Sequence, residues 1–105
     1  MPVKEKRILS MLGLAAKSGN RVSGEFSTEK AVKERKARLV IVAEDASEAT
    51  KKNFRNLCGY YKVPVFFCAD KEVLGHSIGK LFRASAAVTD EGLARAILGL
   101  TGQDN

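Results

Sequence analysis

The sequence has 105 residues, of which 45% are hydrophobic and 29% are charged. This length suffices for one compact core and is too short for two, so we expect a single domain over residues 1–105, frayed at 101–105. Eighteen Lys and Arg residues against 12 Asp and Glu residues give a net charge of +6, which favours an anionic partner such as a nucleic acid over a small neutral substrate. A basic surface that serves only solubility explains the composition equally well.

The sequence argues against a membrane or secreted protein and against a protein stabilised by zinc or disulfides. The sequence has no run of eighteen apolar residues, and its N-terminal stretch MPVKEKRILSMLG lacks the apolar core of a cleaved signal peptide, so we expect a cytoplasmic protein without membrane contact. Cys58 and Cys68 lie in segments that look buried, without CxxC spacing and with one histidine in the chain. We therefore expect core thiols rather than a zinc site or a disulfide framework.

The first half of the chain alternates helix and strand. Apolar residues recur at spacings of three and four over residues 4–17, which predicts an amphipathic helix. Glycine and asparagine at 19–20 suit a turn, and residues 21–23 fit a very short strand. A strongly charged second helix is expected from Gly24 or Glu25 to about Arg35.

The run from Leu39 to Ala43 is continuously apolar, which is typical of a strand buried on both faces of a sheet covered by helices. A third helix follows, with apolar residues on one side between Thr50 and Tyr61. The stretch KVPVFFC, residues 62–68, predicts a second short buried strand, with Pro64 at its entry, where no ladder hydrogen bond is lost.

The last third continues the alternation. Asp70 is placed as the N-cap of a short helix, SAAVT at 85–89 fits a small-residue strand, and residues 90–100 form an apolar stripe at helical spacing. Such an order predicts an α/β fold in which a sheet lies between layers of helices.

Enzyme signatures do not appear in this pattern. The glycines match neither GxGxxG nor a Walker A sequence, so no nucleotide cofactor is expected. The one histidine, His76, has no acid or nucleophile beside it in the sequence and fits a surface or packing role. We expect no catalysis, no cofactor and no metal.

Glu44 and Asp45 follow the most apolar segment directly. They could serve as paired carboxylates for acid–base chemistry or a metal, but adjacent residues leaving a strand diverge and no third oxygen ligand lies nearby. Asp45 with Glu48 instead resembles a capping box for the next helix, with Ser47 as a competing cap. We expect this pair to fix a turn rather than to form a site.

Several segments together resemble a known family. In chain order they are SGE with KAV, ARLVIVAEDAS, YYKVPV, LGHSIGK and RASAAVTDEGLA. Their ordered set, from about Ile8 to Leu100, resembles the kink-turn RNA-binding ribosomal proteins of the archaeal "L-seven-Ae" type, and most closely their short bacterial YlxQ-like branch. The resemblance implies a three-layer α/β/α sandwich around a four-stranded mixed sheet.

The resemblance also implies a function. Members of this family bind, without catalysis or cofactor, an RNA helix bent at an internal loop flanked by tandem sheared G·A pairs. For this chain it implies a monomer whose partner is structured RNA, either ribosomal RNA or another kink-turn RNA, with association to the ribosome or to translation. Three segments carry the implied contacts: the start of the second helix, the turn after the central strand, and the loop before the last strand. The implied RNA-binding residues are Gly24, Glu25, Ser27, Lys30, Lys33, Ser47, Lys51, Arg83, Ala84 and Ser85.

The chain departs from the family at one point. Many relatives have an Asn-Glu pair that reads the sheared G·A edges, where this sequence has Phe26 and Ser27. Ser27 retains hydrogen-bonding capacity, whereas Phe26 cannot replace an amide. A protein-interaction module that kept the fold and lost specific RNA readout is therefore the alternative, and Ala84 and Ser85 equally suit tight packing.

A bent RNA concentrates phosphates, and basic residues from the three segments match that need. We expect Lys30, Lys33, Lys51 and Arg83, with Arg21 and Lys17 beside them, to converge on one edge. Arg35, Lys36 and Arg38 fit a solvated helix face instead.

Overall fold

The computed structural model describes residues 3–101. The elements, in chain order, are α1 (Val3–Lys17), β1 (Arg21–Ser23), α2 (Glu25–Lys33), β2 (Leu39–Val42), α3 (Glu48–Tyr61), β3 (Val65–Phe67), α4 (Lys71–Ser77), β4 (Ser85–Val88) and α5 (Glu91–Thr101). Thr101, the first residue of the tail expected to fray, still belongs to α5. The rest of that tail lies outside the described residues.

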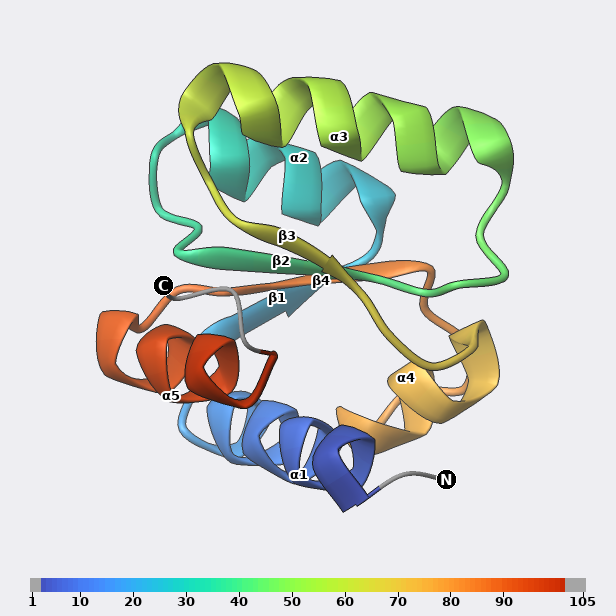
Figure 1. Ribbon diagram of the computed structural model, residues 1–105, viewed down its shortest axis with the longest axis vertical. Helices are drawn as coiled ribbons and strands as arrows, with labels where there is room; N and C mark the ends of the chain where they lie inside the picture. The colour runs from blue at the N-terminus through green and yellow to red at the C-terminus, as the bar shows by residue number, and fades with distance from the viewer. Residues whose placement is uncertain (1–2, 102–105) are drawn as a thin grey trace.

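The four strands form one mixed sheet in the order β1-β4-β2-β3. β4 is antiparallel to both of its neighbours, and β2 and β3 are parallel. Helices α2 and α3 cover one face of the sheet, and α1, α4 and α5 cover the other (Figure 1). The predicted three-layer α/β/α sandwich with a four-stranded mixed sheet is confirmed.

The two inner strands divide the core. Every residue of β2 and β4 is buried, and alternate side chains of β2 enter different clusters. Leu39 and Ile41 pack with α1, α4 and α5, whereas Val40 and Val42 pack with Phe54 and the α2–α3 layer. Because successive side chains of a strand point to opposite faces, an uninterrupted apolar strand needs both faces covered, as the sequence indicated.

β3 differs from its prediction as a buried strand. It is the edge strand next to β2, and its three residues are half-buried. The guanidinium of Arg55 lies over the Phe67 ring, 4.8 Å from its centroid, and covers part of the edge. Pro64 precedes the strand, and its carbonyl accepts from the Val40 N–H at 2.9 Å, so the proline still joins the β2–β3 ladder as an acceptor.

Helices α2 and α3 end with cationic residues in the left-handed region. α2 ends at Lys33, two residues before the predicted end, and Arg35 has a φ of 60°. The C-cap of α3 is Lys62, with a φ of 58°. Glycine is the usual residue in this conformation because it has no Cβ, so a side chain there carries a backbone cost of roughly 1 kcal/mol.

The acidic pair after β2 does not cap α3 as predicted. Ser47 is the N-cap, and its Oγ accepts from the Thr50 N–H at 3.1 Å. Asp45 reaches a different helix, where its Oδ1 accepts from the Lys71 N–H at 2.9 Å at the start of α4. The Glu44 N–H donates to the Ala69 carbonyl at 2.8 Å, so the pair ties the turn after β2 to the α4 side of the sheet.

Both cysteines are free and buried, as predicted. Burial raises the pKa of the Cys58 thiol to about 11. Burial, a hydrogen bond to Glu5 and the charges of Glu5 and Glu44 raise the pKa of Cys68 to about 12. Within residues 3–101, none of the helices has both the length and the apolar character needed to cross a membrane.

Candidate nucleic-acid interface

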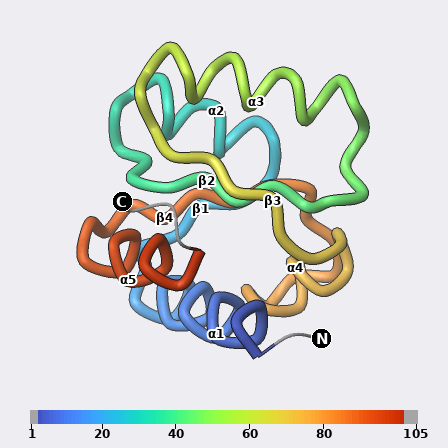
Figure 2. The backbone as a smooth tube through the Cα atoms, in the orientation of Figure 1, coloured from blue at the N-terminus to red at the C-terminus, as the bar shows by residue number. Residues whose placement is uncertain are grey.

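Three loops meet at one end of the sheet. Since β4 runs antiparallel to β1 and β2, the ends of β1 and β2 and the start of β4 lie together. This end, on the right in Figures 1 and 2, also carries the starts of α2 and α3. We call residues 23–27, 44–51 and 81–85 the loop edge.

Gly24 joins the first loop to the third. Its N–H donates to the Ser85 carbonyl at 3.0 Å, and its φ of 90° is one that favours glycine. The Ser85 hydroxyl donates to the Thr28 hydroxyl at 3.4 Å, and both side chains are fully buried. The Ser85 side chain therefore fastens α2 to β4, as in the packing alternative, and the whole residue is buried.

A chain of hydroxyl groups joins the first loop to the second. The Ser47 hydroxyl donates to Thr50 Oγ1 at 3.0 Å, and the Thr50 hydroxyl donates to Glu25 Oε1 at 3.2 Å. A second bond, from Asn53 Nδ2 to Glu29 Oε1 at 2.9 Å, holds α3 to α2 one turn further on. Two predicted site residues, Glu25 and Ser47, are thus connected through Thr50.

Two guanidinium groups meet at the Ser23 hydroxyl. Arg83 Nε donates to Ser23 Oγ at 3.1 Å, and Arg21 Nη1 donates to the same oxygen at 3.3 Å. Backbone carbonyls hold them further: Arg83 Nη1 donates to Phe82 O at 2.8 Å, and Arg21 Nη2 donates to Ile78 O at 3.2 Å. Among the described residues no carboxylate pairs with either arginine, so their charges remain available to an anion.

The predicted lysines are arranged less tightly. Lys51 lies one turn into α3, with its side chain 18% exposed and its Nζ 3.7 Å from Glu48 Oε1. Lys30 and Lys33 belong to the last turn of α2, and Lys30 lies one helical turn beyond Phe26 and Ser27 of the loop edge. Lys33 pairs with Glu29 at 3.9 Å, whereas Lys30 has no ion pair within residues 3–101.

Three exposed apolar residues of the loop edge were not among the site residues predicted from the sequence. Phe26 is 81% exposed at the start of α2, and Leu81 and Phe82 are 74% and 59% exposed in the loop before β4. Phe26 lies off the buried stripe of α2, and Leu81 and Phe82 are adjacent in a segment without strand or helix periodicity. An apolar residue that fits no core pattern was the available signal. Ser27 and Ala84 lie beside this group, exposed and half-buried respectively.

An acidic hollow borders the loop edge on the α4 side. Glu5, Glu44, Asp45 and Asp70 line it. Asp45 and Asp70 both cap α4, Asp70 by accepting from the Val73 N–H at 2.7 Å. Within the described part of the chain, no group of three or more His, Cys, Asp and Glu side chains is arranged to hold a metal ion. The negative charge of these carboxylates disfavours phosphate at this hollow.

Comparison of the sequence with known protein families identifies the family of this chain. A profile of the ribosomal protein L7Ae/L30e/S12e/Gadd45 family matches residues 6–98, and the chain belongs to this family.

Individual relatives cover most of the chain. The sequence is 43% identical to the RNA-binding protein YlxQ of Bacillus subtilis over 90 residues, which cover 86% of this chain and 90% of that protein. It is 32% identical to the large ribosomal subunit protein eL8 of Picrophilus torridus over 84% of this chain and 70% of that protein. A solved structure of a Bacillus halodurans C protein of unknown function superposes with a TM-score of 0.87 at 38% identity, covering 90% of this chain and 96% of that one.

Proposed function

We propose that this protein binds structured RNA through the loop edge, without catalysis, and that it prefers a kink-turn or similarly bent RNA. The observation that carries the proposal is the junction of three loops by Gly24, Thr50 and Ser23, with two arginines free of carboxylate partners. Such a junction is rigid before the partner arrives, so little ordering is lost on binding.

Phosphates are the first class of contact. Arg21 and Arg83 present a double positive charge at the loop edge, and guanidinium groups bind phosphate oxygens with two donors at once. Lys51, on α3, and Lys30 and Lys33, further along α2, suit the flanking helix of a longer RNA. Each neutralised phosphate adds roughly 0.7 to 0.9 to the slope of log affinity against log salt.

Unstacked bases are the second class of contact. Single-stranded and bulged nucleotides are commonly recognised by stacking on exposed aromatic side chains, and Phe26 and Phe82 are such side chains here. Space lies open in front of Gly24, because a Cβ built there meets no atom within 4 Å. RNA can therefore approach the main chain closely at Gly24, and Ser27 and Ser47 offer hydroxyl groups beside it.

The family relationship supports the proposal. YlxQ of Bacillus subtilis is named an RNA-binding protein, and eL8 is a ribosomal protein. We extend RNA binding to this chain on that basis, together with a cytoplasmic, monomeric state and an association with ribosomes or translation.

The exposed apolar residues also favour a second candidate function. Phe26, Leu81 and Phe82 suit a protein partner as well as a base, which fits a member of the family that serves as a protein-interaction module. The two functions differ in what the arginines do, because a protein interface built on these apolar residues does not require Arg21 and Arg83 to be free of carboxylates.

The proposal is tested by titrating variants with a fluorescently labelled kink-turn RNA. Arg83→Ala removes a phosphate contact, and we expect affinity to fall by about tenfold and the salt slope to decrease. Lys30→Ala should weaken binding by about threefold. Lys36→Ala is the matched control, because Lys36 is exposed, pairs with Glu34 at 3.3 Å and lies at the other end of the sheet.

Equal losses from Arg83→Ala and Lys36→Ala would mean diffuse attraction rather than a defined site. No measurable binding by the folded wild-type protein would favour the protein-interaction function.

A further inference from the structure

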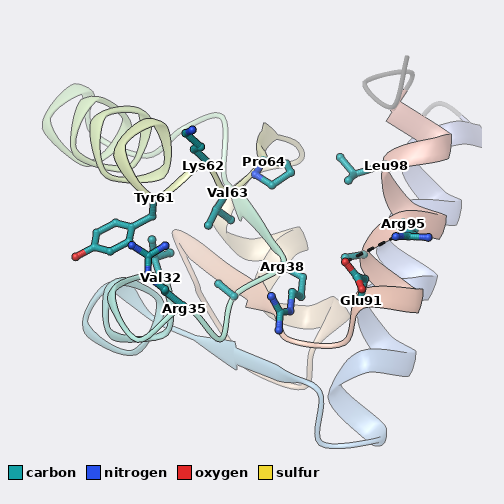
Figure 3. A pocket seen from close by; sticks show the side chains of 12 residues that line it. Val32, Arg35, Arg38, Tyr61, Lys62, Val63, Pro64, Glu91, Arg95 and Leu98 are labelled. Atoms are coloured by element: carbon teal, nitrogen blue, oxygen red, sulfur yellow. Dashed lines mark ion pairs between the residues drawn. The ribbon is translucent and has the colours of Figure 1, made fainter.

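A second basic site lies at the opposite end of the sheet. A cavity of about 400 Å³ opens where α2 and α3 end and where β2 and β3 begin, with α5 as its other wall. In Figure 3, Arg35 and Tyr61 lie on one side, Glu91 and Arg95 of α5 lie on the other, and Arg38 lies between them. The loop edge is at the far ends of the same strands, so the two sites are separate.

Positive charge dominates this cavity. Four cationic side chains line it, from Arg35, Arg38, Lys62 and Arg95, against the single carboxylate of Glu91. That carboxylate pairs with Arg95 at 3.9 Å, and the Arg35 guanidinium lies over the Tyr61 ring at 5.2 Å. Within residues 3–101, the Arg38 and Lys62 side chains have neither an ion pair nor a side-chain hydrogen bond.

Helix ends explain only part of this clustering. Arg35 and Lys62 follow the C-termini of α2 and α3, where a cation is favoured by the helix dipole. Arg38, which precedes β2, and Arg95, in the middle of α5, have no such reason to be there. The cations come from four different segments and converge on one hollow.

The backbone conformation at the ends of α2 and α3 also favours a functional site here. Arg35 and Lys62 both occupy the left-handed region, where glycine is the favoured residue. A backbone strained in this way is more common at functional sites than elsewhere. Here it places two cations at the mouth of one cavity.

The apolar part of the cavity narrows the class of ligand. Three half-buried apolar side chains line the cavity beside the cations: Val63 and Pro64 on one side and Leu98 of α5 on the other. The volume is within the range of small-molecule sites, which combine apolar walls with a few charged groups. An inorganic anion would use only the cations, whereas a nucleotide has both a phosphate and a flat, largely apolar base.

We propose that this cavity is a nucleotide-binding site, distinct from the loop edge. Arg38 holds the phosphate, with Arg35 and Lys62 beside it, and the base or sugar lies between Val63 and Pro64 on one side and Leu98 on the other. The nucleotide is either free or an exposed nucleotide of an RNA strand, since both present the same phosphate and base. The site goes beyond the proposed function and does not depend on it.

The test is an NMR titration of amide chemical shifts in the full chain with uridine monophosphate, adenosine monophosphate and a single-stranded pentauridylate. We expect saturable shifts at Arg38, Val63 and Leu98. Arg38→Ala and Lys62→Gly should each weaken binding by about fivefold or more. Lys62→Gly suits its backbone conformation, so the fold is kept.

Matched controls separate this site from general charge and from the loop edge. Lys36→Ala, which removes a nearby exposed cation outside the cavity, and Arg83→Ala, at the other end, should both leave the saturable shifts at Arg38, Val63 and Leu98 unchanged. Mononucleotides that bind as tightly as pentauridylate would identify a free nucleotide as the ligand. Pentauridylate binding about tenfold tighter, with the same residues shifted, would identify an RNA strand.

The proposal is overturned if no saturable shift appears at the cavity residues with any of these probes. It is also overturned if Lys36→Ala weakens binding as much as Arg38→Ala does.

Discussion

The Ser23 hydroxyl orients two arginines, because it accepts hydrogen bonds from both Arg83 and Arg21. Two like charges held close together repel, and a shared acceptor offsets part of that cost. The pair is therefore oriented before any phosphate arrives. One buried atom, Arg21 Nε, has no partner among the described residues, so even this hydrogen-bonded pair keeps a donor unused.

Ser23→Ala should weaken binding of the kink-turn RNA by about threefold to tenfold, because both arginines lose their common acceptor. Stability should change by less than about 1 kcal/mol, since Ser23 is only half-buried. Ser18→Ala is the control: it also removes a hydroxyl that is hydrogen-bonded, to the Leu14 carbonyl at 2.9 Å, but at the end of α1. Fluorescence anisotropy and thermal melts measure both quantities, and unchanged affinity in Ser23→Ala would contradict the role of the pair.

The two thiols give a prediction that concerns the core alone. Their pKa values of about 11 and about 12 keep Cys58 and Cys68 protonated at pH 8. Because the thiolate is the nucleophile, iodoacetamide should modify the native protein far more slowly than the protein unfolded in guanidinium chloride. Mass spectrometry counts the modified thiols, and rapid labelling of the native protein would mean that these cysteines are not buried.

At the scale of elements, α4 supports the loop edge through one glycine. A Cβ at Gly75 would lie 2.8 Å from the Leu81 carbonyl oxygen and 2.9 Å from the Phe82 Cα. These are backbone atoms, which cannot rotate away as a side chain does. The helix and the loop that carries Leu81 and Phe82 are therefore in direct contact, and the position of the loop depends on that contact.

Gly75→Ala should destabilise the protein by about 1 to 3 kcal/mol and weaken RNA binding, because the loop must move. Gly59→Ala is the matched control. Gly59 is an exposed helical glycine with no atom within 4 Å of a built Cβ, so alanine should stabilise the protein by roughly 0.5 to 1 kcal/mol. Chemical denaturation and RNA titration measure both, and equal stability changes in the two variants would show that the close contact at Gly75 is absent.

The sequence predicted some features of the helices and strands correctly and others wrongly. The apolar run at Leu39–Val42 predicted a buried strand correctly, because burial on both faces leaves no polar position. The N-cap of α3 could not be predicted from local sequence, because Asp45 and Ser47 both suit that position. The choice depends on α4, where Asp45 accepts a hydrogen bond from the Lys71 N–H. The edge position of β3 depended on strand order, which local periodicity does not contain.

On the scale of the whole molecule, the sheet separates two basic ends with different character. The loop edge combines Arg21 and Arg83 with exposed aromatic residues, whereas the opposite end has a cavity around Arg38. The net charge of +6 predicted an anionic partner. It did not predict two separate basic ends, because a net charge does not say where the charged residues lie. Arg35 and Arg38 were predicted to lie on a solvated face; both are exposed, as predicted, and both also line the cavity.

The candidate site was predictable in part. The resemblance located the three segments that meet at the loop edge, and Gly24, Glu25, Ser47 and Arg83 lie there together. It did not distinguish the buried Ser85 side chain from an exposed one, and it did not select Phe82. The direction of the Ser85 side chain depends on the register of β4, whereas Phe82 lies in the loop before β4, where no strand periodicity predicts its direction.

If the loop edge recognises the shape of a bent RNA, as we propose, bent and straight RNAs of equal length must differ in affinity. The wild-type protein is titrated with a kink-turn RNA and with a straight duplex of the same length, at two salt concentrations. We predict that the kink-turn RNA binds at least about tenfold tighter at both concentrations, because stacking and close backbone approach do not weaken with salt as phosphate contacts do. Affinities that agree within a few fold for the two RNAs would contradict the claim.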